Sequence, residues 1–116
     1  METRPIDGRI LIVEDPFVTG FLRSVLEKNG FSVVCARPEP ALDLLRTGQM
    51  RCELLITNRP SPFAEVGERM PLLYLSACPD PDQVSSFRTW LSLTKPFPPR
   101  ELLEAVGDLL GCGAVK

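Results

Sequence analysis

Five apolar runs of strand length alternate along the chain with segments in which apolar residues recur at helical spacing. An uninterrupted run such as Ile10 to Val13 is typical of a strand that is buried on both faces of a parallel sheet. The pattern predicts strands at 9–13, 31–36, 53–57, 71–77 and 90–94. It predicts helical segments at 16–28, 40–47, 63–69, around 84–87 and at 99–110.

Prolines and glycines mark the ends of several predicted helices. Pro16 and Pro99 stand where helices begin, and Gly30 follows a helix end. Alternation of strands and helices is typical of a parallel sheet covered on both faces by right-handed crossovers. We therefore expect one α/β domain over 1–116, a doubly wound five-stranded sheet with its core at about 8–111.

Composition narrows the class of protein. The chain has 116 residues, of which 44% are hydrophobic and 24% charged, and these values suit one globular domain. The net charge is −2 and the 13 basic residues are scattered, so we expect no nucleic-acid binding. No apolar run is long enough to span a membrane, and the N-terminus does not have the order of a signal peptide. A cytoplasmic protein without membrane contact is expected.

The cysteines and the missing histidine exclude several kinds of chemistry. The four cysteines form no C-x-x-C pair, and the chain has no histidine, so the usual zinc sites and histidine-based triads are excluded. We expect reduced cysteines, with Cys35 buried in its apolar run. Cys112, between two glycines, is expected to be exposed and to form disulfide-linked dimers on storage.

Polar residues stand at or directly after the ends of four of the predicted strands. In a doubly wound sheet, ligands bind beyond the carboxyl ends of the strands, so these residues are expected to meet at one edge. Each has a plain structural explanation too: a solvated strand end, a turn asparagine, a capping hydroxyl or a surface amine. Only their combination indicates a site. They are Glu14 and Asp15, Asn58, Ser76 and Lys95.

With these residues in place, the chain resembles the receiver domain of bacterial two-component response regulators over nearly its whole length. Any one of the shared motifs alone would be weak, but together and in this order they are specific. They are Ile-Val-Glu-Asp at 12–15, Leu-Ile-Thr-Asn at 55–58, Pro62 four residues after Asn58, Leu-Ser-Ala at 75–77 and Thr-Lys-Pro-Phe at 94–97. The resemblance implies a flavodoxin-like receiver fold.

The resemblance also implies a role for each polar residue. Glu14 and Asp15, with Asn58 and the Pro60 backbone, would form a Mg²⁺ site, Ser76 would be the switch hydroxyl, and Lys95 would pair with phosphate. The family's phosphoacceptor is an aspartate, and Asn58 stands in its place. A neutral amide is a poor nucleophile and forms no acyl phosphate, so we expect no phosphorylation and a weak or vestigial metal site. The Asn58 amide is expected to donate to Glu14 or Asp15.

Other departures from the family concern the readout of phosphorylation. The family's aromatic residue three positions before the lysine is replaced by Ser92, and Trp90 is the nearest aromatic residue on that strand. Asn58 and Ser76 are only 18 residues apart, so helices three and four of the receiver fold are expected to be shortened. Trp90 and the apolar stripe of the last helix are expected in the core. That stripe is Leu102, Leu103, Val106, Leu109 and Leu110.

The leading hypothesis is therefore a signalling module without enzymatic activity that is not phosphorylated and acts by binding a protein. The partner would be a histidine kinase, a regulator or an output protein, and the last helix with the strand at 90–94 would form the contact or a homodimer. Because the chain stops soon after Leu110, we expect a stand-alone adaptor. The alternative is a flavin or nucleotide module on the same fold, although the turn at 14–17 lacks phosphate-binding glycines. A hydrolase ranks last, because no histidine base is present.

Overall fold

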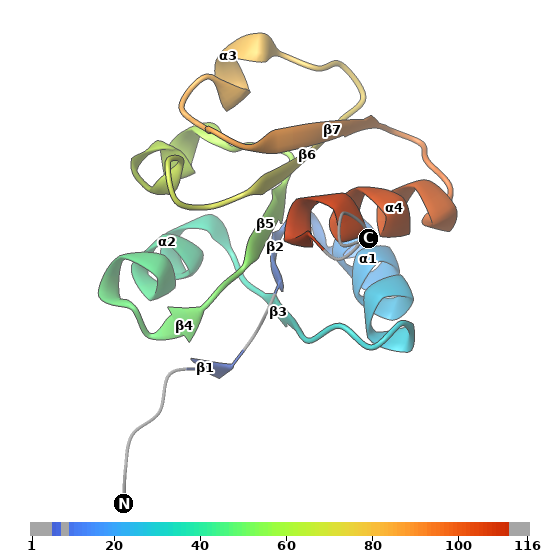
Figure 1. The fold of residues 1–116 in the computed structure, drawn as a ribbon, viewed down its shortest axis with the longest axis horizontal. Coiled ribbons are helices and arrows are strands. Elements are labelled where there is room, and N and C mark those ends of the chain that lie inside the picture. Colours follow the sequence, from blue (N-terminus) through green and yellow to red (C-terminus); the bar gives the residue numbers. More distant parts are fainter. Residues whose placement is uncertain (1–5, 8–9, 112–116) are drawn as a thin grey trace, which may run out of the picture.

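A parallel five-stranded sheet forms the centre of the computed structural model, which describes residues 6–7 and 10–111. The strand order is β3-β2-β5-β6-β7, and every neighbouring pair is parallel, so the predicted fold class is confirmed. Figure 1 shows this sheet with helices on both of its faces. The strands are β2 Ile10–Val13, β3 Val33–Cys35, β5 Leu54–Thr57, β6 Leu72–Ser76 and β7 Trp90–Thr94.

Two long helices cover one face of the sheet and three shorter helical segments cover the other (Figure 1). The first face carries α1 Pro16–Lys28 and α4 Pro99–Leu110, both with the predicted bounds. The second face carries α2 Pro38–Thr47, the 3₁₀ segment η1 Ser61–Val66 and α3 Pro81–Val84. The shortening predicted for helices three and four is confirmed by η1 and α3.

Several helical segments begin earlier than predicted. The α2 helix begins at Pro38 rather than at residue 40, because proline fits the first helical positions. The segment predicted at 63–69 is η1 Ser61–Val66, and the one predicted around 84–87 is α3 Pro81–Val84; a proline again stands at the first or second helical position of each. A separate pair of two-residue strands, β1 Ile6–Asp7 and β4 Met50–Arg51, was not predicted. Strands this short have no recognisable period in the sequence, so only their mutual pairing defines them.

The core consists of two apolar layers, one on each face of the sheet. Along β2, Ile10 and Ile12 pack against the α1 and α4 side, while Leu11 and Val13 pack against the α2, η1 and α3 side. All four are buried, as the uninterrupted apolar run predicted. Side-chain packing on both faces therefore holds the sheet rigid, including the edge where the strands have their carboxyl ends.

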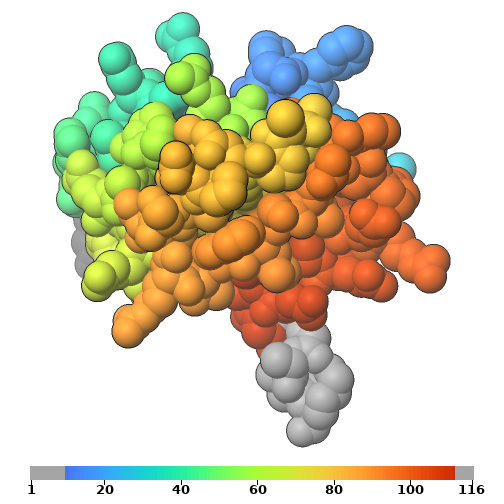
Figure 2. Space-filling view, turned by 90° about the horizontal axis from the view of Figure 1, so that it is seen from above, coloured from blue at the N-terminus to red at the C-terminus, as the bar shows by residue number. Residues whose placement is uncertain are grey.

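The prediction that Trp90 belongs to the core is wrong. Its side chain is 43% exposed, and the neighbouring Leu91 is 37% exposed, because β7 is the edge strand and α3 is too short to cover it. Figure 2 looks onto this edge and shows segment 78–95 at the surface, between the region around η1 and that around α4. In α4, Leu102 and Val106 are fully buried as predicted. The other members of the stripe, Leu103, Leu109 and Leu110, are half-buried.

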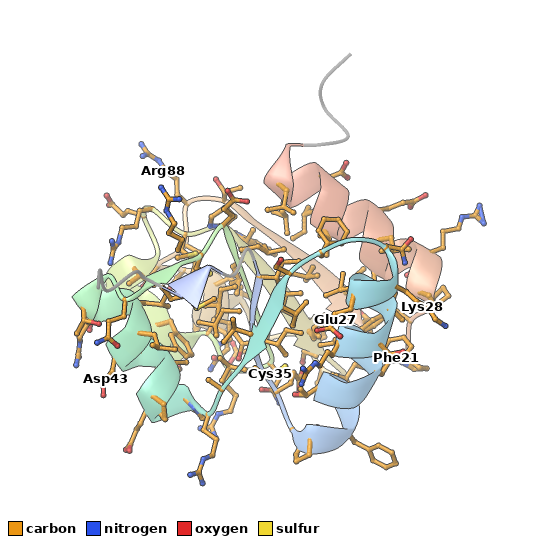
Figure 3. The ribbon with its side chains drawn as sticks, turned by 90° about the horizontal axis from the view of Figure 1, so that it is seen from below. Phe21, Glu27, Lys28, Cys35, Asp43 and Arg88 are labelled. Carbon is orange, nitrogen blue, oxygen red and sulfur yellow. The ribbon has the colours of Figure 1, made fainter. Side chains whose placement is uncertain are left out.

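The cysteines differ in burial and therefore in reactivity. Cys35 lies on β3 beside α1 (Figure 3) and is half-buried rather than fully buried, and burial raises the pKa of its thiol. Burial raises the pKa of Cys52 further, to about 11, and its thiol donates to the Leu54 carbonyl at 3.2 Å. Cys78 is exposed, and the three are free thiols. The prediction for Cys112 lies outside the described residues.

Candidate functional site

The carboxyl ends of β2, β5, β6 and β7 bring the predicted polar residues to one edge of the sheet. Val13 pairs in register with Thr57, so the residues that follow them, Glu14 and Asn58, leave the sheet side by side. Ser76 pairs with Thr94, and Lys95 follows at once. Glu14 and Asn58 both line a hollow of about 240 Å³ between the ends of β2 and β5. The convergence expected from the strand ends is present.

The strongest contact at this edge is an ion pair between Glu14 and Lys95. Their side-chain Oε2 and Nζ atoms lie 3.0 Å apart, with the Glu14 side chain fully buried and that of Lys95 25% exposed. The approach is close enough for an ion pair, yet Glu14 Oε2 has no hydrogen bond of good angle among the described residues. The other oxygen, Oε1, accepts from the Asp15 N–H at 3.1 Å. A buried carboxylate therefore depends on Lys95 for its neutralisation.

Asp15 has a different task from its neighbour. Its Oδ1 atom accepts the Val18 N–H at 3.0 Å, which makes Asp15 the N-cap of α1. Pro16 takes the first helical position behind it. The side chain is exposed, whereas that of Glu14 is buried. The two adjacent acids are thus turned to separate partners.

Asn58 is half-buried, and no hydrogen bond joins its amide to Glu14 or Asp15 in the part of the chain that the structure describes. The expected donation from Asn58 is therefore corrected, because Lys95 occupies the place beside Glu14. Pro60 is buried, and its carbonyl accepts the Phe63 N–H at 2.8 Å where η1 begins. The backbone oxygen that the resemblance assigned to a metal is thus part of a turn.

The Ser76 hydroxyl is also part of a local turn. Its Oγ atom accepts the Cys78 N–H at 3.0 Å, and its carbonyl accepts the Lys95 N–H at 3.1 Å. These two bonds fix the loop after β6 and place the start of the Lys95 loop beside it. Ser76 and Lys95 are therefore brought together through the backbone.

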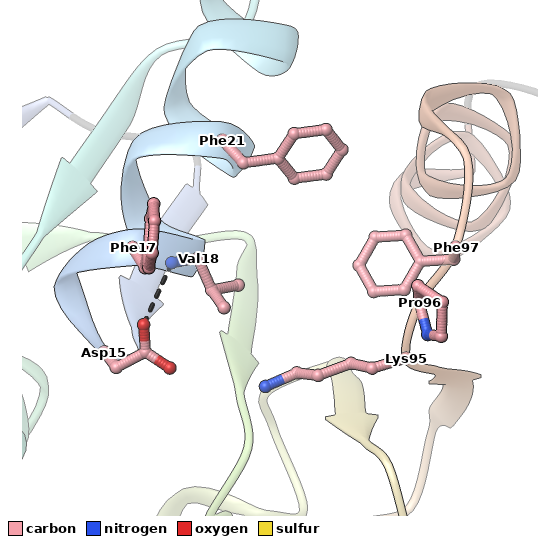
Figure 4. A pocket seen from close by; sticks show the side chains of 7 residues that line it. All are labelled: Asp15, Phe17, Val18, Phe21, Lys95, Pro96 and Phe97. Carbon is pink, nitrogen blue, oxygen red and sulfur yellow. Dashed lines mark hydrogen bonds between the residues drawn. The ribbon is translucent and has the colours of Figure 1, made fainter.

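A second hollow, of about 450 Å³, lies beside the first turn of α1 and was not predicted as a site (Figure 4). Phe17 and Phe21 both belong to the apolar pattern of α1, yet Phe17 is 91% and Phe21 39% exposed. The Phe21 and Phe97 rings meet edge to face, with centroids 6.1 Å apart. We call this the aromatic hollow. It is lined by Asp15, Phe17, Val18, Phe21, Lys95, Pro96 and Phe97.

Comparison with solved structures finds the same arrangement of sheet and helices over nearly the whole chain. A response regulator receiver protein from Sinorhizobium medicae WSM419 superposes with a TM-score of 0.71 at 20% identity, covering 95% of this chain and 98% of its own. The chain has the receiver fold. The match covers nearly the whole chain, so the fold part of the sequence resemblance is confirmed.

Other solved structures with the receiver fold match equally well. Chemotaxis protein CheY4 from Vibrio cholerae has a TM-score of 0.71 at 21% identity, covering 90% of this chain and 98% of its own. The signal receiver domain of a signal transduction histidine kinase from Syntrophus aciditrophicus has a TM-score of 0.69 at 24% identity, covering 94% and 92%. No family model and no curated protein matches the sequence.

The acids as placed do not fit a divalent ion, although the receiver fold implies one at this edge. Magnesium requires several open oxygen ligands in near-octahedral geometry. Here the Glu14 carboxylate is buried against a cation, Asp15 caps a helix, and the Pro60 carbonyl closes a turn. Over residues 10–111, no three histidine, cysteine or acidic side chains lie close enough to share a metal ion.

Ser92, which replaces the family's aromatic residue on β7, lies beside an aromatic residue on the neighbouring strand β6. Ser92 on β7 is exposed, and its register partner on β6 is Tyr74, which is buried. The Tyr74 hydroxyl accepts the Asp80 N–H at 3.1 Å and so fixes the loop that leads into α3. One signal in the sequence could have pointed to this residue: Tyr74 is the chain's single tyrosine and lies two positions before Ser76.

Proposed function

We propose that this protein is a receiver-like signalling module of the two-component type that takes no phosphoryl group and acts through protein contacts. The observation that carries the proposal is the buried Glu14–Lys95 ion pair beside Asn58. The site has the neutral Asn58 amide where a nucleophile would stand. Its lysine, Lys95, is already paired with Glu14. A site of this kind favours one state without metal or phosphate.

The chemistry of Asn58 supports this proposal. An amide oxygen carries no full negative charge, and attack on phosphorus would not give the stable acyl phosphate that a carboxylate gives. Lys95 would have to leave the buried Glu14 carboxylate in order to pair with an incoming phosphoryl oxygen, and that would leave an unpaired buried charge. Both effects oppose phosphoryl transfer.

The contact surface that we propose is formed by α4 and β7. The partner of this surface would be a histidine kinase, a regulator or an output protein. Trp90 and Leu91 are exposed on β7, whose five residues carry no charge, and neutral apolar edges of this kind are typical of interaction sites. No cofactor or enzymatic activity is part of this proposal, and the module would act in the cytoplasm.

Mass spectrometry after incubation with acetyl phosphate and Mg²⁺ tests the proposed function. We expect the intact native chain to keep its mass. An added phosphoryl group that maps to the peptide containing Asn58 would overturn the proposal. The Asn58→Asp variant serves as the comparison: it is expected to stay largely unmodified as long as Lys95 remains paired with Glu14, and to be modified more in an Asn58→Asp, Glu14→Gln background.

A further inference from the structure

The aromatic hollow has the features of a self-complementary protein surface. It joins a protruding side chain, Phe17, to an adjacent apolar depression between α1 and the loop after β7 (Figure 4). Phe17 is the most exposed large apolar side chain among the described residues, at 91%. A protrusion and a depression on one face allow two copies to fit each other about a two-fold axis.

The walls of the depression suit an aromatic ring. Phe21 and Phe97 meet edge to face, and Val18 and Pro96 complete the apolar lining. A volume of about 450 Å³ is large enough to admit a phenylalanine side chain together with its backbone. Phe17 of a second copy would therefore enter a space bordered by rings, while Phe17 of the first copy enters the matching space across the axis.

The charges at the border of the hollow are complementary in the same way. One acid, Asp15, and one base, Lys95, line it, and the two are not within ion-pair distance of each other among the described residues. Asp15 uses only Oδ1 for the α1 cap, and Lys95 has three N–H donors beside its ion pair with Glu14. Each copy therefore offers one carboxylate oxygen and spare ammonium protons to the other.

We propose that two copies of this chain associate through the aromatic hollow, with Phe17 of each copy in the hollow of the other and Asp15 facing the partner's Lys95. The interface lies on α1 and the loop 95–97, and it includes neither Trp90 nor Leu91 of the surface in the proposed function. It would also cover the outer side of the Lys95 loop. A small patch of this kind gives a reversible dimer whose population depends on concentration.

Analytical ultracentrifugation of the full chain over a concentration series tests this dimer. The native protein is expected to show a reversible monomer–dimer equilibrium. Phe17→Ala is expected to weaken the dimer at least about tenfold, because a central aromatic anchor is lost. Asp15→Asn retains the helix-capping oxygen and is expected to weaken the dimer and to reduce its dependence on salt. Circular dichroism of each variant shows that it is folded.

Trp90→Ala on β7 is the matched control, because it also truncates an exposed aromatic side chain. It is expected to leave the dimer unchanged. A native chain that is monomeric at every concentration would overturn the proposal. So would a dimer that survives Phe17→Ala, or one that Trp90→Ala alone abolishes. Phosphorylation of the native chain would contradict the proposed function without affecting this result, so the two failures are distinguishable.

Discussion

Lys95 could pair either with the Glu14 carboxylate or with a phosphoryl group, and in the structure it pairs with Glu14. A carboxylate that is fully removed from water requires a cation close by, and Lys95 Nζ at 3.0 Å provides it. In a site with an aspartate at position 58, that second carboxylate would compete with Glu14 for the lysine. The neutral Asn58 side chain removes that competing negative charge, so the pair with Glu14 is favoured.

Replacing Lys95 with methionine tests the importance of this pair. Lys95→Met keeps most of the side-chain volume but leaves Glu14 buried without its partner. We expect the free energy of unfolding to fall by about 2 kcal/mol, below the usual cost of breaking a buried pair because Lys95 is 25% exposed. Urea denaturation at neutral pH measures the change.

The control for this prediction is the exposed pair of Arg100 and Glu104, whose charged atoms are 4.0 Å apart. Arg100→Met is expected to change the free energy of unfolding by no more than about 0.5 kcal/mol. Adding Glu14→Gln to Lys95→Met is expected to restore most of the lost stability, because the buried charge is then removed. Equal effects of the two single variants would show that Glu14 does not depend on Lys95.

For single residues, the sequence predicted which polar side chains lie at the edge of the sheet better than it predicted which of them contact each other. Glu14, Asn58, Ser76 and Lys95 do lie at or directly after strand ends at one edge, because register in a parallel sheet places successive ends together. The pairing of Glu14 with Lys95 was not predicted, because 81 positions separate them and side-chain burial decides which groups meet. For the same reason, the Asn58 amide was given a partner that it does not have.

Among the elements, the short η1 segment depends on two features for its position. Arg46 on α2 donates to both oxygens of Glu65, from Nε and from Nη2, each at 3.0 Å, and this contact holds the pKa of Glu65 below its ordinary 4.5. Gly67 then allows the backbone around Ser86 to approach the end of η1, and Arg88 N–H donates to the Gly67 carbonyl at 3.1 Å. Close approach of the backbone compensates for the reduced length of the helices.

Gly67→Ala is expected to destabilise the fold by about 2 kcal/mol, because the new methyl group would overpack a buried contact. A Cβ atom at this position would lie 2.0 Å from the Ser86 carbonyl oxygen and 2.7 Å from its carbon, and both belong to the backbone. The segment that joins α3 to β7 would have to move. Thermal unfolding and hydrogen exchange of segment 85–89 measure the effect.

Gly107 is the matched control, because it lies inside α4 and a Cβ atom there would meet nothing within 4 Å. Gly107→Ala is expected to stabilise the protein by about 0.5 kcal/mol through its higher helix propensity. A Gly67→Ala variant as stable as Gly107→Ala would show that the approach of Ser86 is not required.

The long elements could be predicted because their patterns are local. The α1 and α4 helices and the strand at 90–94 have the bounds that spacing and proline positions indicated. The exposure of Trp90 could not be predicted in the same way. The exposure of Trp90 depends on how far α3 extends over the neighbouring strand β7. An aromatic residue in a strand pattern is predicted to be buried whether or not another element covers it.

The whole molecule has the receiver fold. At its polar edge, the Glu14 carboxylate and the Lys95 ammonium group neutralise each other. The shortened α3 leaves β7 exposed on one side, and Phe17 stands exposed beside the polar edge on another. We propose that signalling uses these surfaces rather than chemistry at Asn58. No helix among residues 10–111 is long and apolar enough to cross a membrane.

The most direct test of this account is an NMR titration of the native chain with Mg²⁺ and then with beryllofluoride, which imitates a phosphoryl group. If Glu14 and Lys95 already satisfy each other, the amide signals of residues 14, 58 and 95 will not move in a saturable way. Saturable shifts of these amides at millimolar Mg²⁺, enlarged by beryllofluoride, would contradict the claim that the Glu14–Lys95 pair keeps metal and phosphoryl groups from this edge.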